Sequence, residues 1–199
     1  MRKPADHRKA EIVAKVLELA DRIGPDRVTT GAVATEIGIT QAALFRHFPT
    51  KSAMWTAVAE QVSDGLGRAW ASALSSGTKP LDRIAALIAA QLHQIAATPA
   101  MPMLLFSREL NVDNADLRAA FRDRLSAFHA LLLQEITHGQ QQGEIRDDVT
   151  ASDIAVLLIS LVQGVAIRWS LGSRNFALQD EGERLLAVQL HLLATKGIR

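Results

Sequence analysis

The stretch TTGAVATEIGITQAALFRHFPTK, residues 29–51, decides the fold of this chain because it contains two short helical segments around one tight turn. Thr29 or Thr30 can cap the first helix, and Thr40 is placed to cap the second, with a hydroxyl that accepts from a free backbone N–H. Gly38 can adopt the left-handed conformation that the turn between them needs. The sequence therefore predicts a helix-turn-helix, with helices over about 30–37 and 41–48.

Small and apolar side chains occur at the offsets that two steeply crossing helices require. Ala34 is small where the helices approach each other, and Leu44 and Phe48 can anchor the second helix. The predicted shared core is Val33, Ile37, Ile39 and Leu44.

The face of the second helix that these anchors leave exposed is suited to the major groove of DNA. Gln41 can pair with an adenine edge, and Arg46 can reach guanine or a phosphate. A plain helical hairpin with solvated polar side chains is the alternative, and the turn glycine together with an exposed Phe45 favours DNA binding. The predicted contacts are Thr30, His47 and Lys51 to phosphates, Ala42, Ala43 and Phe45 to thymine methyl groups, and Gln41 and Arg46.

The longer stretch VTTGAVATEIGITQAALFRHFPTKSAMWTAVAEQ resembles the amino-terminal signature of the TetR family of bacterial regulators. The resemblance covers about residues 10–61. Its motif elements are the Thr-Thr start, the turn glycine and an aromatic-x-His-Phe-x-x-Lys run, which begins here at Phe45 and ends at Lys51. The family usually has Tyr at the place of Phe45, so a hydroxyl that commonly meets a phosphate is absent, and we expect altered affinity for DNA.

The rest of the chain also has helical periodicity, and no alternating strand pattern stands out. We therefore expect an all-α fold of about nine helices, with a DNA-binding domain over 1–50 and an effector-binding and dimerisation domain over 51–199. The predicted helices outside the helix-turn-helix cover about 4–23, 51–75, 81–98, 102–110, 115–142, 153–171 and 180–195, with residues 111–114 as a break and Ser152 as a cap.

The two last predicted helices are more apolar than one face of a small bundle requires. This excess predicts a homodimer, which also suits DNA binding, because one helix-turn-helix contacts few base pairs and a two-fold pair contacts a palindrome. A buried central helix in a monomer is the alternative. The expected interface residues are Ile154, Leu157, Leu158, Leu161, Val165, Leu186, Leu190 and Leu193.

The resemblance to the family implies a repressor that leaves a palindromic operator when an unidentified small, largely apolar ligand binds. Methionines and aromatic residues can line such a pocket, although ordinary core packing explains each one equally well. A DNA-bound structural or adaptor protein of the nucleoid-occlusion type, whose bundle binds a protein partner, is the alternative function. The candidate pocket residues are Trp55, Trp70, His93, Met101, Met103, Phe106, Phe128 and Gln163.

Composition limits the other possible functions. The 199 residues contain no cysteine, which excludes disulfides and thiolate sites and fits a cytoplasmic protein. Residues 1–51 carry nine Lys and Arg against six Asp and Glu, whereas the remainder carries thirteen against fifteen. The sequence contains no His-Glu-x-x-His, dinucleotide or catalytic-triad pattern and no apolar run long enough to cross a membrane. We therefore expect no catalytic residue, no metal site, no cofactor and no membrane association.

Overall fold

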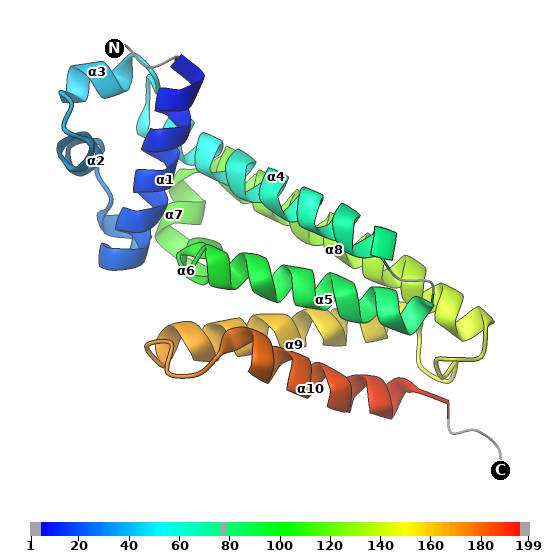
Figure 1. Ribbon diagram of the computed structural model, residues 1–199. Helices are drawn as coiled ribbons and strands as arrows, with labels where there is room; N and C mark the ends of the chain where they lie inside the picture. Colours follow the sequence, from blue (N-terminus) through cyan, green and yellow to red (C-terminus); the bar gives the residue numbers. More distant parts are fainter. Residues whose placement is uncertain (1–4, 77–78, 196–199) are drawn as a thin grey trace. The chain divides into compact units, whose positions relative to one another are not determined.

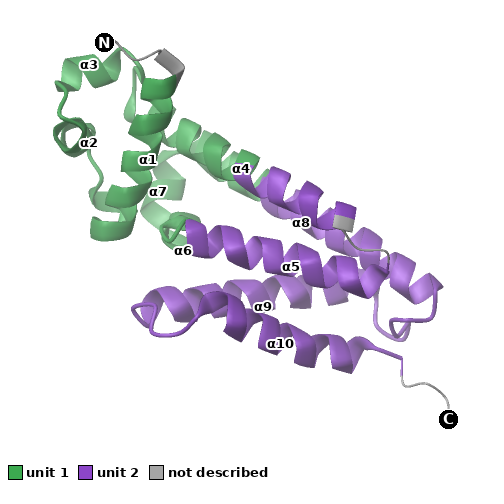
Figure 2. Cartoon of the chain, viewed as in Figure 1, with its two compact units in different colours: residues 1–64, 98–123 green, residues 65–97, 124–199 purple. Residues whose placement is uncertain are grey.

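The computed structural model describes residues 5–76 and 79–195, and within these ranges the chain is all-α. Its contacts divide it into two compact units (Figure 2). Unit 1 comprises residues up to 64 together with 98–123, and unit 2 comprises 65–97 together with 124 onward. The predicted DNA-binding domain, residues 1–50, is smaller than unit 1, which also includes residues 51–64 and 98–123.

Unit 1 is built around the amino-terminal helix α1 (Ala5–Ile23), which packs against α2 (Thr30–Ile37), while α2 packs against α3 (Gln41–Phe45) (Figure 1). The apolar stripe of α1 explains this arrangement, because Ile12, Val16 and Leu19 are almost completely buried. The other elements of unit 1 are the 3₁₀ turn η1 (Pro25–Arg27), α6 (Met101–Phe106), α7 (Arg108–Asp113), α4 (Lys51–Ser76) as far as residue 64 and α8 (Ala115–Gln141) as far as residue 123.

The single helix predicted over 102–110 is wrong, since α6 and α7 are separate helices. Ser107 has extended backbone angles (φ −67°, ψ 109°), and its hydroxyl accepts from the amide of Leu110 at 3.0 Å, which starts α7. The predicted break at 111–114 also fails over most of its length. Asn111 continues the helix while its side-chain amide donates to the carbonyl of Ser107 at 2.7 Å, so the chain leaves α7 only at Asn114.

Unit 2 contains the helices α5 (Pro80–Ala97), α9 (Ala151–Leu171) and α10 (Leu178–Leu193), and each of the three contacts the other two (Figure 1). It also contains the remaining parts of α4 and α8. A Cβ atom at Gly182 would overlap the side chain of Leu92, so α10 approaches α5 closely because residue 182 has no side chain. The apolar inner faces of these helices form the core of the unit.

The amino terminus of α9 differs from the prediction. Thr150, and not Ser152, caps the helix, because the Thr150 hydroxyl accepts from the amide of Asp153 at 3.1 Å. The prediction that no apolar run is long enough to cross a membrane is wrong on length and composition, because α9 meets both criteria. A core helix passes the same test, and α9 packs on α5 and α10. With α6 and α7 separate, the described residues contain ten α-helices and one 3₁₀ turn, where about nine helices were predicted.

Candidate nucleic-acid interface

The turn between α2 and α3 has the conformation that its sequence predicts. Gly38 is left-handed, with φ 73° and ψ 36°, and its amide donates to the carbonyl of Thr35 at 3.1 Å. The amide of Ile39 donates to the carbonyl of Ala34 at 3.0 Å, so the last carbonyls of α2 are satisfied as the chain turns. Thr40 then caps α3 by accepting from the amide of Ala43 at 3.2 Å. This turn fixes the direction in which α3 leaves α2.

Buried side chains fix the rotation of α3 about its axis. Leu44 has no exposed surface and Phe48 is 4% exposed, and Val33 and Ala34 of the neighbouring α2 are buried as well. α3 ends at Phe45, earlier than predicted, so the anchor Phe48 lies beyond its end, although the amide of Phe48 still donates to the carbonyl of Leu44 at 3.0 Å. With these anchors inside, the opposite side of α3 faces solvent.

We call the exposed side of α3, together with Arg46 directly after it and Lys51 at the start of α4, the recognition surface. Phe45 is the aromatic residue on this side and is 39% exposed. Of the eight predicted contact residues, Ala43 and His47 are half-buried and Thr30 is buried. The recognition surface consists of Gln41, Ala42, Phe45, Arg46 and Lys51, all of which are exposed.

Thr30 has a position that the sequence did not reveal. Thr29, and not Thr30, caps α2, by accepting from the amide of Ala32 at 3.1 Å. The hydroxyl of Thr30, in a residue only 9% exposed, accepts instead from the side-chain amide Nε2 of Gln41 at 2.8 Å. The structure therefore brings together two predicted DNA contacts as a hydrogen-bonded pair. Since they are eleven positions apart, only the crossing of α2 and α3 makes them neighbours.

An ion pair joins α1 to α2. The guanidinium of Arg22 donates to the Glu36 carboxylate at 2.8 Å, and this hydrogen bond holds the pKa of Glu36 below its usual range. The same bond raises the pKa of Arg22. This pair could not be predicted from the sequence, because its members lie fourteen positions apart on different helices. The positive charge of Arg22 therefore offsets the negative charge of Glu36, the acidic residue of α2.

Four of the eight candidate effector residues lie in unit 1. Trp55 has no exposed surface, and its indole N–H has no hydrogen-bond partner among the described residues. Met101 is buried, whereas Met103 is 40% and Phe106 is 51% exposed. The hydroxyl of Ser63, also on α4, is a second buried polar group without a partner in the described part of the chain.

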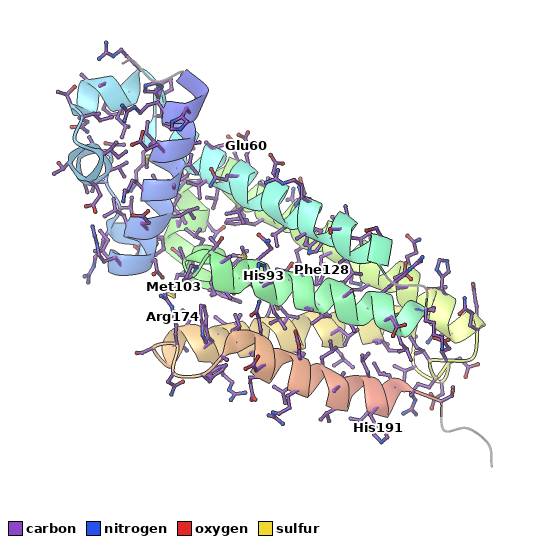
Figure 3. The ribbon with its side chains drawn as sticks, in the orientation of Figure 1. Glu60, His93, Met103, Phe128, Arg174 and His191 are labelled. Atoms are coloured by element: carbon purple, nitrogen blue, oxygen red, sulfur yellow. The ribbon has the colours of Figure 1, made fainter. Side chains whose placement is uncertain are left out.

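The other four candidate effector residues lie in unit 2. Trp70 and Phe128 stack with their ring centroids 4.9 Å apart, and the indole N–H of Trp70 donates to the side chain of Gln91 at 3.0 Å. His93 lies on α5 (Figure 3) and is exposed, and its Nδ1 forms a 2.7 Å hydrogen bond with the side-chain amide of Gln179. Gln163 is half-buried. Within unit 2, the stacked rings of Trp70 and Phe128 are thus two candidate pocket side chains that lie in contact.

The last two long helices expose apolar side chains that the inner core does not use. Of the eight predicted interface residues, five are buried inside the chain's own bundle, namely Ile154, Leu158, Val165, Leu186 and Leu193. Leu161 and Leu190 are half-buried, and Leu157 is 51% exposed. We define the outward strip as the exposed apolar residues of α9 and α10, which are Val156, Leu157, Leu171, Val188 and Leu192.

Comparison with known proteins gives these surfaces a family context. Residues 12–58 match the profile of the tetR family of bacterial regulatory proteins, and residues 80–194 match that of the carboxyl-terminal region of BetI-type transcriptional repressors. The chain belongs to the TetR family. It is therefore a DNA-binding transcriptional regulator, and the helix-turn-helix predicted from residues 29–51 is confirmed as part of that fold.

Relatives of this TetR family regulator include proteins that are named for different roles. The nucleoid occlusion factor SlmA of Haemophilus influenzae is 25% identical over 168 residues, which cover 82% of this chain and 75% of that protein. The ketosteroid regulator KstR2 of Mycobacterium tuberculosis has a TM-score of 0.80 and 19% identity, covering 95% of this chain and 96% of that chain. A regulator from Saccharomonospora viridis, in complex with choline, has a TM-score of 0.79 and 22% identity over 96% and 100% of the two chains. At these identities the two structures establish the fold.

Proposed function

We propose that this TetR family regulator is a cytoplasmic, non-enzymatic homodimer that represses transcription from a palindromic operator and is released by a small, largely apolar ligand. The observation that carries the proposal is the presence of two exposed surfaces of opposite chemistry. The recognition surface offers amide, guanidinium and ammonium groups to DNA. The outward strip offers apolar side chains that a second copy of the chain would cover.

The composition of α9 supports pairing with a second copy. Val156 and Leu157 are 50% and 51% exposed, and Leu171 is 76% exposed. Between them, Gly164 is exposed, and a Cβ atom there would meet nothing within 4 Å, so a partner helix can approach closely. Burying such a strip would contribute about 25 cal/mol for each Å² of apolar surface.

Two buried polar groups on α4 support a ligand site in unit 1. A buried donor without a partner costs about 1–3 kcal/mol, and such groups in native proteins call for an explanation. The indole N–H of Trp55 and the hydroxyl of Ser63 are two such groups. A mostly apolar ligand with one or two oxygen atoms would satisfy them while its hydrocarbon part remains out of water.

Selection of bound duplexes from a random DNA pool by the full chain tests the proposal. We expect a palindrome whose half-sites lie about 34 Å apart or a multiple of that distance, because a two-fold dimer presents two identical recognition surfaces. An asymmetric motif would contradict dimeric binding. Titration with a ketosteroid, the largely apolar class of compound for which one structural neighbour is named, then tests release. A compound that binds the protein should lower its affinity for the duplex, and one that binds without this effect would contradict the switch.

The likeness to SlmA favours one second function, a DNA-bound structural or adaptor protein whose bundle binds another protein. Exposed apolar side chains on α6 and α7 are consistent with such a partner. Chromosome-wide occupancy separates the two functions, since a repressor should occupy a few promoters and an adaptor should occupy sites spread over the chromosome. The exposed residues are Met103, Leu105, Phe106 and Val112.

A further inference from the structure

We infer that Thr30 is a positioning residue that sets base specificity by holding the side chain of Gln41 in the conformation that contacts an adenine. The inference rests on the proposed base contact of Gln41 and assigns Thr30 a role different from the phosphate contact that its sequence position suggests. It is carried by the 2.8 Å hydrogen bond from Gln41 Nε2 to Thr30 Oγ1.

The two ends of this hydrogen bond lie in different environments. Thr30 is the first residue of α2 and is only 9% exposed, so its hydroxyl is fixed within the unit. Gln41 is the first residue of α3 and is exposed. A buried and immobile acceptor therefore fixes the direction of an exposed, flexible side chain.

The hydrogen bond leaves the groups that an adenine needs. The amide nitrogen of Gln41 has two hydrogens, of which Thr30 takes one. The second N–H and the carbonyl oxygen Oε1 remain for the N7 acceptor and N6 donor of adenine in the major groove. The neighbouring Gly31 leaves room on this side, because even a Cβ atom there would stay 4.0 Å from Oε1.

Holding the side chain in advance makes adenine recognition more favourable than it is for a free glutamine. A free glutamine side chain loses rotamer freedom when DNA immobilises it, and this loss weakens the matched complex. A different base pair at this position cannot form the bidentate contact with Gln41. Binding to such a duplex therefore gains nothing from the preset conformation of the side chain. Thr30 therefore raises the preference for adenine at one position of each half-site.

The test measures binding of the full chain to the palindromic duplex selected from a random pool, and to three duplexes with another base pair at one symmetric position. Gln41→Ala identifies that position as the one where preference is lost. Thr30→Val should lower the preference there by about fivefold and leave other positions unchanged. Thr30→Ser should restore the preference, and Gln41→Ala should show no further loss when combined with Thr30→Val.

Thr35→Val is the matched control in the same helix, because the Thr35 hydroxyl donates to the carbonyl of Gly31 at 3.0 Å and is exposed. It should leave the preference unchanged. Preference is a ratio of affinities from one preparation, so partial misfolding of Thr30→Val does not alter it. An equal loss of affinity for all four duplexes would overturn the positioning role and favour a phosphate contact. If Gln41→Ala loses no preference at any position, the base contact itself is wrong.

Discussion

The recognition surface of α3 and the outward strip of α9 are both exposed, but their exposure has opposite meanings. Gln41 and Arg46 are polar and are well solvated by water without a partner. The exposure of the apolar side chains of Val156 and Leu157 to water is unfavourable. The strip therefore indicates a permanent protein contact, and the recognition surface indicates a reversible one. The predictions below change one surface at a time.

The largest effect is expected when charges are placed on the outward strip. Leu157→Glu combined with Leu192→Glu would bury two unpaired carboxylates from each protomer in the proposed dimer, so we expect the dimer dissociation constant to rise by about 1,000-fold, or ~4 kcal/mol. Sedimentation velocity measures this change. The matched control is Leu105→Glu with Val112→Glu, which replaces residues of unit 1 with 39% and 61% exposure, compared with 51% and 61% on the strip. Equal dissociation by both double variants would argue against a specific interface.

A smaller effect is expected from removing the anchor of α3. Leu44→Ala deletes a side chain with no exposed surface, and such changes cost about 2–5 kcal/mol. Hydrogen exchange of the α2 and α3 amides should accelerate accordingly, while exchange in unit 2 should remain unchanged. Leu105→Ala, at a residue that is 39% exposed, is the control. Unchanged exchange in Leu44→Ala would show that α3 does not depend on this anchor.

Removing the ammonium group of the recognition surface, Lys51, should have a moderate effect. Lys51→Ala should weaken binding to every duplex sequence by a similar factor and reduce the dependence of log affinity on log salt by about one unit, as expected for one lost phosphate contact. Lys79→Ala, an exposed lysine of unit 2, should leave both quantities unchanged. A loss confined to one base pair would instead place Lys51 against a base edge.

The ion pair between α1 and α2 should give the smallest effect, visible as a pH dependence. Because Arg22 lowers the pKa of folded Glu36, this pair adds stability above the ordinary pKa of Glu, and that stability is lost as the pH falls through the lowered value. Glu36→Gln should flatten this acid-side part of the thermal stability curve. Arg22→Gln should do the same, and the double variant should add nothing more. An additive loss in the double variant would show that the two side chains act separately.

Local chemistry explains why the helix-turn-helix could be predicted from the sequence. Gly38 adopts the left-handed turn conformation because it is glycine, and Thr40 caps α3 through its own hydroxyl. The hydrogen-bond partners of both residues lie within five positions in the sequence. The same kind of reasoning failed near Ser107 and Asn111, because polar residues of this type can cap, break or continue a helix. Which of these occurs depends on the partner that the side chain finds.

Tertiary contacts explain what the sequence could not predict. The bond between Thr30 and Gln41 exists only after α2 and α3 cross, and the apolar pattern of α9 does not say which leucines face inward. Leu158 is fully buried and its neighbour Leu157 is half-exposed, although both belong to one apolar run. Assignment of the outward strip therefore needed the packing of α5, α9 and α10.

Photocrosslinking most directly tests the claim that the two surfaces have different partners. p-Benzoylphenylalanine would be placed at Phe45 in one sample and at Leu157 in another, each bound to the selected palindromic duplex. We predict a DNA adduct from position 45 and an adduct with a second copy of the chain from position 157. A DNA adduct from position 157, or none from position 45, would contradict the assignment of α3 to DNA and α9 to the dimer.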